Sequence, residues 1–325
     1  MKAWLFTRYG SPEELRLEDV PRPEPASDEV LIRVRAAALN SWDFELMRGN
    51  TLANRLMFGL TRPRKISTLG MDIAGVVEAA GSGVRALRPG DEVFGDIHPS
   101  GWGGFAEYAT ARADLLVKKP PPLSFVDAAA LPQAGQMALQ ALRSFAPVQP
   151  GQKVLINGAG GGVGTFAVQM ARAWGAEVTG VDHGSKLDML RSLGAAHVLD
   201  YTSCDYTRQG QQYDLIVDCN VRGSALKYRR ALAPGGTFVA VGGVIPWLLE
   251  HLLWGLALKA LGAGKKMRIL PYVSKSADME QLAELLQAGQ VKPVIERTLP
   301  LEGVPEALGL LEKGLVRGKL VIAMD

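Results

Sequence analysis

The residues best suited to chemistry lie in Val154–Gly164, VLINGAGGGVG, where an apolar run leads into glycines and then into a helical pattern. Glycines in such a loop permit a tight turn and close packing of the following helix on the strand. They leave backbone N–H groups and the positive end of the helix facing a bound pyrophosphate. The order of strand, glycine loop and helix therefore predicts a dinucleotide-binding site. The residues assigned to it are Gly160, Gly161, Gly162, Val163 and Gly164.

Two other classes of nucleotide-binding protein also use glycine loops. A Walker-type loop would need lysine after the final glycine, but Thr165 follows Gly164, which excludes that class. A methyltransferase would carry an acid at the end of the second strand, and Asp182 fits that description. The β-rich first third of the chain argues against this class, because a minimal methyltransferase has no need of such a region.

Asp182 and the residues after it bear on the choice of nicotinamide cofactor. A carboxylate near the adenosine ribose accepts hydrogen bonds from a 2′-hydroxyl and repels a 2′-phosphate, which favours NAD. Ser185 and Lys186 lie in the same strand-to-helix loop and could bind a 2′-phosphate, which favours NADP. This local chemistry leaves the two cofactors close to even. The alternative for Lys186 is a solvated residue in the first turn of a helix.

Composition limits the class of protein. The chain has 325 residues, a length typical of two domains. Its 37 glycines make up a larger share of the chain than the usual share of about 7%. Two cysteines exclude a disulfide framework, and a net charge of only +3 argues against a nucleic-acid partner. The N-terminus has no secretory pattern, and the uninterrupted apolar run Leu252–Leu258 is shorter than the roughly 18 residues of a membrane span. We therefore expect a cytoplasmic location.

The elements that must position these residues change in type along the chain. Short strand-like runs separated by Gly and Pro in the first third predict a small barrel-like β unit. Pro120–Pro122 forms a stiff connector, so we expect a domain boundary at residue 122. Beyond it, helical and β-rich runs alternate, which predicts an α/β parallel sheet wrapped by helices. The tail from Val291 returns to β character, but the pattern does not say where the tail packs.

The predicted elements have the following bounds. Strands are expected at Val30–Ala38, Ile73–Ala80, Val93–Gly95, Lys153–Asn157, Glu177–Val181, His197–Leu199, Leu215–Asp218, Thr237–Val241, Val294–Leu299 and Lys319–Ala323. Helices are expected at Phe125–Ala146, Val163–Trp174, Ser185–Leu193, Ser224–Leu232 and Pro305–Lys313.

Motifs along essentially the whole chain carry a family resemblance. They are Ala38-Leu39-Asn40 followed by Asp43, GMDIAGVVEAAGSGV at Gly70–Val84, PGDEVFG at Pro89–Gly95, GGFAEYA at Gly103–Ala109, LPQAGQMALQAL at Leu131–Leu142, VLINGAGGGVGTFAVQMA at Val154–Ala171, SLGAAHVLDY at Ser192–Tyr201 and RGKLVI at Arg317–Ile322. Together they resemble the medium-chain dehydrogenase/reductase superfamily, specifically its zinc-independent quinone oxidoreductase-like branch.

The resemblance implies an architecture of two domains. A GroES-like β-rich catalytic domain would comprise residues 1–122 and be completed by residues 288–325, which accounts for the β-rich tail. A Rossmann domain, a doubly wound parallel sheet at residues 123–287, would bind the cofactor. The cofactor and substrate would lie between the domains, and a homodimer is expected.

The resemblance also implies an enzyme without zinc. At the places of the zinc ligands this chain has Asn40–Asp43, Gly70–Asp72 and Leu131–Gln133, which contain neither Cys nor His. The two cysteines, Cys204 and Cys219, lack the paired spacing of a metal site. Without a Lewis acid, the site is poorly equipped to deprotonate an alcohol. Reduction of an activated C=C bond or a quinone is easier, because the charge develops on an oxygen that needs only hydrogen-bond donors.

Three polar residues are the candidates for the catalytic site. Asn40 matches the asparagine that zinc-independent relatives place near the nicotinamide, and its amide is the expected donor to the substrate. The alternative is an asparagine that caps or turns the chain. Asp43 is expected to cap the helix carrying Phe44–Arg48, and Asp72 to hold hydrogen bonds around the site or between the domains.

The resemblance tips the cofactor toward NADPH. Lys186 and Tyr201 fall where NADPH-dependent relatives bind the 2′-phosphate. Asp182 departs from the small or neutral residue usual at its position, which keeps NADH as an alternative. The remaining implied cofactor residues are Arg317, which would close over the cofactor, and Gly242 and Gly243, which follow the strand facing the nicotinamide.

Two apolar segments, Met47–Leu69 and Val244–Ala263, are expected to form a lid for a small hydrophobic enone or quinone, with contact to a membrane surface as a hypothesis. The alternative is packing in a core or dimer interface. The first function predicted is an NADPH-dependent, zinc-independent enone or quinone reductase. The alternatives are a carbonyl reductase or alcohol dehydrogenase without zinc, and a non-catalytic NADPH-binding sensor.

Overall fold

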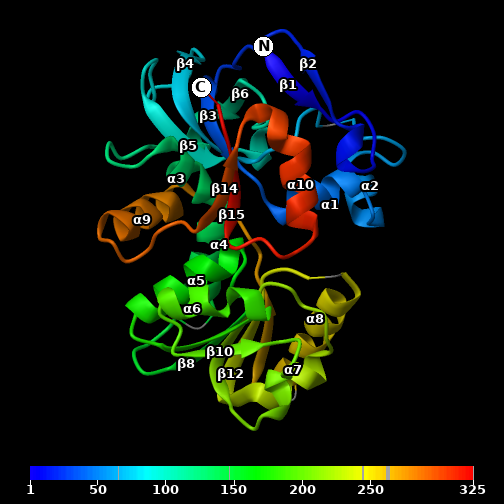
Figure 1. Ribbon diagram of the computed structural model, residues 1–325, viewed down its shortest axis with the longest axis vertical. Coiled ribbons are helices and arrows are strands. Elements are labelled where there is room, and N and C mark those ends of the chain that lie inside the picture. Colours follow the sequence, from blue (N-terminus) through cyan, green and yellow to red (C-terminus); the bar gives the residue numbers. More distant parts are fainter. Residues whose placement is uncertain (65, 146, 244, 261–263, 325) are drawn as a thin grey trace. The chain divides into compact units, whose positions relative to one another are not determined.

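The chain folds into two compact units (Figure 1), and the computed structural model describes residues 1–64, 66–145, 147–243, 245–260 and 264–324. The first unit consists of Met1–Ala134, Ser274–Glu284 and Pro293–Asp325, and the second of Gly135–Val273 and Leu285–Lys292. The first boundary comes later than the predicted residue 122, because helix α3, Phe125–Ala130, packs on strands of the first unit. The chain returns to the first unit at Ser274 and again at Pro293, not once at residue 288.

The first unit is built on a seven-stranded sheet. The strand order is β14-β15-β3-β4-β5-β7, and β6 also pairs with β3. Antiparallel pairing of β15 with β3 places Val321 opposite Ala38, so the C-terminal tail completes this sheet as the resemblance implied. The strands are β3 (Glu29–Ala38), β4 (Asp72–Ala80), β5 (Glu92–Asp96), β6 (Tyr108–Arg112), β7 (Leu116–Lys118), β14 (Ile295–Leu299) and β15 (Lys319–Ala323), with β1 (Lys2–Leu5) and β2 (Arg16–Asp19) in a separate two-stranded sheet.

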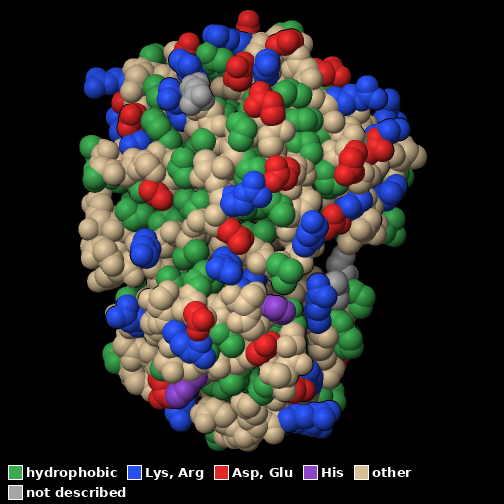
Figure 2. Space-filling view, in the orientation of Figure 1, with side chains coloured by type: hydrophobic (Ala, Val, Ile, Leu, Met, Phe, Trp, Pro, Cys, Tyr) green, Lys and Arg blue, Asp and Glu red, His purple; other side chains and the backbone are tan. Residues whose placement is uncertain are grey.

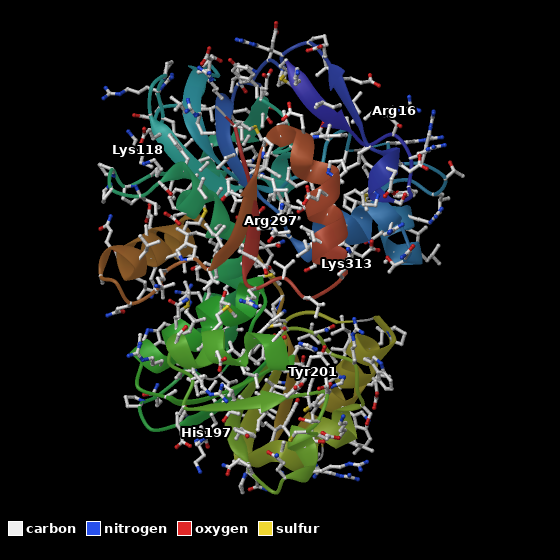
Figure 3. The ribbon with its side chains drawn as sticks, viewed as in Figure 1. Arg16, Lys118, His197, Tyr201, Arg297 and Lys313 are labelled. Carbon is white, nitrogen blue, oxygen red and sulfur yellow. The ribbon has the colours of Figure 1, made fainter. Side chains whose placement is uncertain are left out.

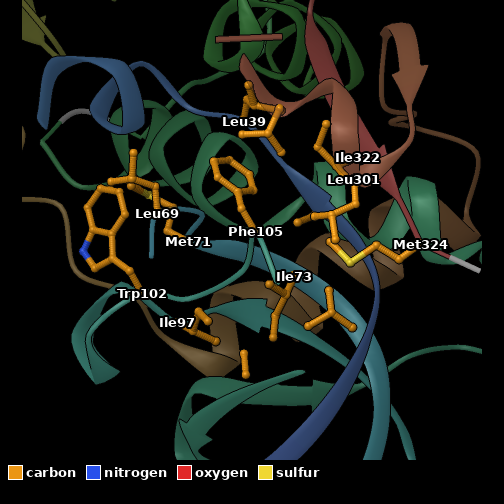
Figure 4. Close-up of a cluster of buried hydrophobic side chains, with 14 of the residues drawn as sticks. Leu39, Leu69, Met71, Ile73, Ile97, Trp102, Phe105, Leu301, Ile322 and Met324 are labelled. Carbon is orange, nitrogen blue, oxygen red and sulfur yellow. The ribbon is translucent and has the colours of Figure 1, made fainter. Parts of the chain in front are cut away.

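Helices and buried side chains complete the first unit. Figure 4 shows its core, where Met71, Ile73, Phe105 and Ile322 are fully buried. Helix α10 contacts both β15 and α1 (Figure 1). The helices are α1 (Ser41–Arg48), α2 (Leu52–Phe58), α3 and α10 (Val304–Glu312), while α4 (Pro132–Arg143) and α9 (Ser276–Gln287) begin in this unit and continue into the second.

The second unit is a six-stranded parallel sheet with the order β10-β9-β8-β11-β12-β13. The order reverses between β8 and β11, so the predicted doubly wound sheet is confirmed, and the carboxyl ends of these two strands form the switch point where such folds bind ligands. The elements are β8 (Lys153–Asn157), α5 (Gly162–Ala173), β9 (Glu177–Asp182), α6 (Leu187–Ser192), β10 (His197–Asp200), β11 (Tyr213–Asp218), α7 (Ala225–Ala231), β12 (Leu232–Ala240), α8 (Ile245–Ala260) and β13 (Lys266–Ile269).

Short 3₁₀ helices punctuate both units. They lie at Pro12–Glu14, His98–Ser100, Ala113–Leu115, Gly184–Lys186, Tyr206–Arg208 and Leu301–Gly303.

Two predictions of secondary structure need correction. The predicted helix Phe125–Ala146 is two helices, α3 and α4, because Pro132 has no N–H to continue the first one. The strands β1, β2, β6, β7 and β13 and the helices α2, α8 and α9 were not predicted. Helix α8 was missed because it is apolar on both its buried and its exposed face and gives no helical periodicity.

The two apolar segments divide between core and surface. Phe58 packs in the core of the first unit, and Leu248 and Trp254 pack against the core of the second, which confirms the core alternative for these residues. Lys65, Val244 and residues 261–263 lie outside the described residues. The exposed members are Leu52, Leu56 and Met57 on α2, and Trp247, Leu249, Leu252, Leu253 and Leu256 on α8.

None of the helices in the described ranges is long and apolar enough to cross a bilayer. On the face drawn in Figure 2, Lys and Arg side chains are interspersed with Asp and Glu.

Candidate functional site

The glycine loop joins β8 to α5 in the second unit. Helix α5 begins at Gly162 with Gly161 as its N-cap, and no side chain caps it, so its first N–H groups are left for an acceptor such as a pyrophosphate. A Cβ at Gly164 would collide with the backbone of Gly158 and Ala159, whereas a Cβ at Gly161 would have its nearest neighbour 3.4 Å away. Gly164 is thus needed for helix packing, and a Cβ at Gly161 would be tolerated with only an ordinary van der Waals contact. This cradle fits a dinucleotide.

Asp182, at the end of β9, holds the glycine loop. Its Oδ2 accepts a hydrogen bond from the N–H of Gly160 at 2.7 Å, and its Oδ1 accepts one from the N–H of His183 at 2.8 Å. Lys186 Nζ lies 3.4 Å from Oδ1. Because Lys186 is only 3% exposed, the alternative that it is a solvated residue is wrong.

An exposed polar group flanks the Asp182–Lys186 pair. Tyr201 follows β10, is 57% exposed (Figure 3), and donates its N–H to the carbonyl of Asp182 at 3.2 Å. The ring of His183 lies 6.2 Å from that of Tyr201, and His183 Nδ1 lies 2.9 Å from Ser185 Oγ. The structure therefore brings together the predicted residues Asp182, Ser185, Lys186 and Tyr201. It adds His183, which sequence reasoning missed although this residue directly follows Asp182.

The switch point carries two further residues that sequence reasoning missed. Asn157 ends β8 and donates its Nδ2 hydrogen to Asp218 Oδ1, at the end of β11, at 2.9 Å. Burial raises the pKa of the Asp218 carboxyl to about 6. Gly242 and Gly243 follow β12, and a Cβ at Gly242 would lie 2.9 Å from the carbonyl oxygen of Cys219. Polar residues ending adjacent parallel strands were the signal that could have identified Asn157 and Asp218.

Four strand ends meet at one edge of the sheet in the first unit. Lys319 begins β15, Asn40 follows β3, Asp72 begins β4 and Asp96 ends β5. The antiparallel register places Ala38 opposite Asp72, and Asp72 opposite Asp96. Residues far apart in the sequence are thereby neighbours at this edge.

The side chain of Asn40 lies between a cation and a carboxylate. Lys319 Nζ donates to Asn40 Oδ1 at 2.6 Å and to the carbonyl of Leu39 at 2.8 Å. Asn40 Nδ2 donates to Asp72 Oδ2 at 2.9 Å, and Lys319 Nζ lies 3.5 Å from the same oxygen. The N–H of Gln133, in the first turn of α4, donates to Asp72 Oδ1 at 3.0 Å. Asn40 is thus the N-cap residue of α1 by position, but its amide serves this network.

Asp43 caps α1 from within, as its third residue. Its Oδ2 accepts from the N–H of Asn40 at 2.7 Å, which is half of a capping box, and its Oδ1 accepts from the N–H of Gly70 at 2.9 Å. The predicted capping role is confirmed. Burial raises the pKa of Asp43 to about 7, and burial raises the pKa of Asp72 to about 7 although the Lys319 ammonium opposes that rise.

A histidine–carboxylate contact and an aromatic group adjoin this edge. His98 Nδ1 lies 2.8 Å and 2.9 Å from the two oxygens of the buried Asp96. The ring of Trp42 lies 5.4 Å from each of the rings of His98 and Trp102. Trp102 has a φ of 73°, a left-handed conformation that is rare for a bulky side chain.

Arg317 lies in the first unit, with an exposed side chain. Its N–H donates to Glu296 Oε2 at 2.8 Å. The contact of Arg317 with a cofactor stays a prediction.

Neither cysteine belongs to a metal-binding arrangement in the described part of the chain, where no group of three or more His, Cys, Asp or Glu side chains is placed to hold a metal ion. Cys204 and Cys219 are both free thiols, and burial raises the pKa of Cys219.

Comparison with known proteins covers both units. Residues 26–121 match the family described as alcohol dehydrogenase GroES-like domain, and residues 193–322 match the family described as zinc-binding dehydrogenase. The mitochondrial NAD(P)H oxidoreductase RTN4IP1 of Bos taurus is 34% identical over 99% of this chain and 89% of its own length. The 2-methylene-furan-3-one reductase of Solanum lycopersicum is 35% identical over 99% of this chain and 79% of its own length.

A solved structure extends this similarity to the fold. The quinone oxidoreductase from Coxiella burnetii is 32% identical, with a TM-score of 0.89 over 100% of this chain and 99% of that one. The first unit is accordingly GroES-like and the second a Rossmann fold. The chain is an NAD(P)H-dependent oxidoreductase and belongs to the zinc-independent, quinone oxidoreductase-like branch of the medium-chain dehydrogenase/reductase superfamily.

Proposed function

We propose that this chain is an NADPH-dependent reductase that transfers hydride to an activated C=C bond or to a quinone. Two similar proteins are named as a methylene-furanone reductase and a quinone oxidoreductase. These names support an activated C=C bond or a quinone as the acceptor. The observation that carries the proposal is the Asn40 amide, whose Nδ2 is set as a hydrogen-bond donor by Asp72 and Lys319.

Asn40 has the chemistry that such a reduction needs. A bound nicotinamide supplies the hydride, and negative charge then develops on the carbonyl or quinone oxygen. Nδ2 of Asn40 carries two N–H bonds, and Asp72 accepts one of them. We assign the second N–H to the substrate oxygen, where a fixed donor stabilises the developing charge. An amide takes up no proton near neutral pH, so Asn40 suits an oxyanion better than the deprotonation of an alcohol.

Asp43 and Asp72 are proposed as positioning residues. Both are fully buried, and every carboxylate oxygen of the two accepts a hydrogen bond from within the first unit. Asp43 fixes the start of α1 beside Asn40, and Asp72 fixes the Asn40 amide. Neither carboxyl is therefore proposed to touch the substrate.

The preference for NADPH is proposed from the group around Lys186. The oxygens of Asp182 already accept the N–H groups of Gly160 and His183, so this acid supports the loop and is not reserved for a ribose hydroxyl. Ser185, His183 and Tyr201 add polar groups beside the Lys186 cation. Such a cluster fits a 2′-phosphate better than a bare 2′-hydroxyl.

We also propose which molecules this protein binds. A small hydrophobic enone or quinone is the proposed substrate, and a homodimer without nucleic acid the proposed assembly. The exposed leucines of α8 are the surface we propose for a subunit interface or for peripheral membrane contact.

Turnover with Asn40→Ala tests the proposed function. NADPH and NADH are titrated into the wild type, and cofactor oxidation is then followed with a benzoquinone and with a long-chain enone. We expect Asn40→Ala to lower kcat by about 100-fold, as removal of an oxyanion donor does, while NADPH still binds. Gln149→Ala removes an exposed amide outside both apolar segments; it is the control and is expected to keep wild-type kcat.

Three results would contradict the proposal. An unchanged kcat in Asn40→Ala would remove Asn40 from the reaction. Binding of NADPH by the wild type without turnover of either acceptor would favour a sensor. Accumulation of an alcohol from a saturated ketone would favour a carbonyl reductase.

A further inference from the structure

We infer that Lys319 is a positioning residue for the reduction, because it holds the Asn40 amide in the orientation that presents Nδ2 as the donor. This inference rests on the proposed role of Asn40. Lys319 is the first residue of β15 and lies far from Asn40 in the sequence. It acts on the substrate only through its hydrogen bond to Asn40.

The hydrogen-bond partners define the orientation of the amide. An ammonium group only donates, so Lys319 Nζ selects the oxygen of the Asn40 amide. Above about pH 7 the Asp72 carboxyl is mostly ionised and then only accepts, so its Oδ2 selects the nitrogen of Asn40. A flipped amide would place Nδ2 against the ammonium and Oδ1 against the carboxylate. The two contacts together leave one orientation.

Lys319 supports this arrangement in a second way, through the charge of Asp72. Its ammonium lies 3.5 Å from Asp72 Oδ2 and opposes the rise in the Asp72 pKa that burial causes. Without that ammonium Asp72 would bind a proton more readily, and a protonated carboxyl both donates and accepts. Asp72 would then no longer select one orientation of Asn40.

The local backbone places Lys319 for this purpose. Gly318 has a φ of +68°, and a Cβ there would collide with the carbonyl oxygen of Val294, so the turn before Lys319 requires glycine. The Lys319 side chain is 3% exposed, and its three N–H bonds face Leu39, Asn40 and Asp72. A fully partnered, buried ammonium has little freedom to move, which suits it to holding a neighbour.

A purely structural role for Lys319 is the alternative, and Lys119 provides the matched control. Lys119 is also a buried lysine of the first unit, with Nζ 2.6 Å from the carbonyl of Leu123 and 2.8 Å from Glu92. Its contacts do not include Asn40. Lys119→Met should therefore lower stability without lowering kcat.

Steady-state kinetics of Lys319→Met, Asn40→Ala and the double variant test the inference. We expect Lys319→Met to lower kcat by about 10- to 100-fold, the cost of a misplaced catalytic group, with the KM for NADPH nearly unchanged. The double variant should be no slower than Asn40→Ala alone, because Lys319 acts through Asn40. The rise of kcat with pH that accompanies ionisation of Asp72, which lies near pH 7 in the wild type, should shift to higher pH in Lys319→Met. Lys319→Arg should retain more activity than Lys319→Met.

The outcomes separate this inference from the proposed function. If the folded Lys319→Met variant keeps wild-type kcat, or if the losses of the two single variants multiply in the double variant, the positioning role is wrong while the role of Asn40 stands. If Asn40→Ala keeps wild-type kcat, both fall. Should Lys319→Met fail to fold, Asp72→Asn combined with Lys319→Met removes both charges, and wild-type kcat in that variant overturns the inference.

Discussion

Lys186 and Asp182 form a buried ion pair that supports the fold and that we propose also serves cofactor binding. Asp182 accepts the N–H groups of Gly160 in the glycine loop and of His183, and the Lys186 ammonium lies 3.4 Å from the same carboxylate. The cation is thus held at the end of β9 before any ligand arrives, and binding needs little further ordering of its side chain.

Lys186→Ala is expected to weaken NADPH binding selectively. Loss of a charge-assisted hydrogen bond to the 2′-phosphate should raise the Kd for NADPH about tenfold or more, with little change for NADH. Fluorescence titration with both cofactors measures this, and the exposed Lys153→Ala serves as the control. Equal weakening of both cofactors would mean that Lys186 only supports the loop through Asp182.

At the scale of elements, the contact between β8 and α5 decides whether the glycine loop has its shape. Gly164 lies where the helix backbone approaches Gly158 and Ala159, whereas a Cβ at Gly161 would make only an ordinary van der Waals contact with the carbonyl oxygen of Gly158. Similar glycines in one loop therefore have different tasks, one in packing and one in ligand access.

The variants Gly164→Ala and Gly161→Ala should separate these tasks. We expect Gly164→Ala to lower the free energy of unfolding by about 1–3 kcal/mol, because the added methyl group pushes α5 away from β8. Gly161→Ala should keep most of the stability and lose cofactor affinity. Urea unfolding and cofactor titration of both variants give the comparison, and equal stability of Gly164→Ala and wild type would refute the packing role.

For the whole molecule, buried carboxyl groups link stability to pH. Burial raises the pKa of Asp43 from 3.8 to about 7 in the folded chain. The folded state therefore holds a proton on Asp43 at pH values where the unfolded state has released it. The contribution of Asp43 to stability is full below about pH 4 and is lost as the pH rises through about 7.

Asp43→Ala is expected to show this dependence in its free energy of unfolding. The loss of stability relative to wild type should be largest in acid and should shrink as the pH approaches and passes neutrality. Urea unfolding across this range measures it, with Asp188→Ala as the control because the Asp188 side chain is 99% exposed. A loss that stays constant with pH would show that Asp43 does not titrate as assigned.

The order of the elements and the dinucleotide loop were predictable because their signals are local. An apolar strand that runs directly into glycines, and then into a helix, is contained within Val154–Trp174. The break at Pro132 and the helix α8 were missed. The break was missed because the apolar pattern continues across Pro132. Helix α8 was missed because its exposed leucines remove the contrast between an apolar and a polar face.

The sequence by itself determined the fold class, the family resemblance and the cofactor loop, since backbone conformation and short-range packing depend on neighbouring residues. Only the tertiary structure decided that Lys319 holds Asn40 and that Asp182 pairs with Lys186 inside the protein. The physical reason is register and burial. Pairing of β15 with β3 and of β3 with β4 brings distant residues to one edge, and the removal of water there makes each charge depend on its partner.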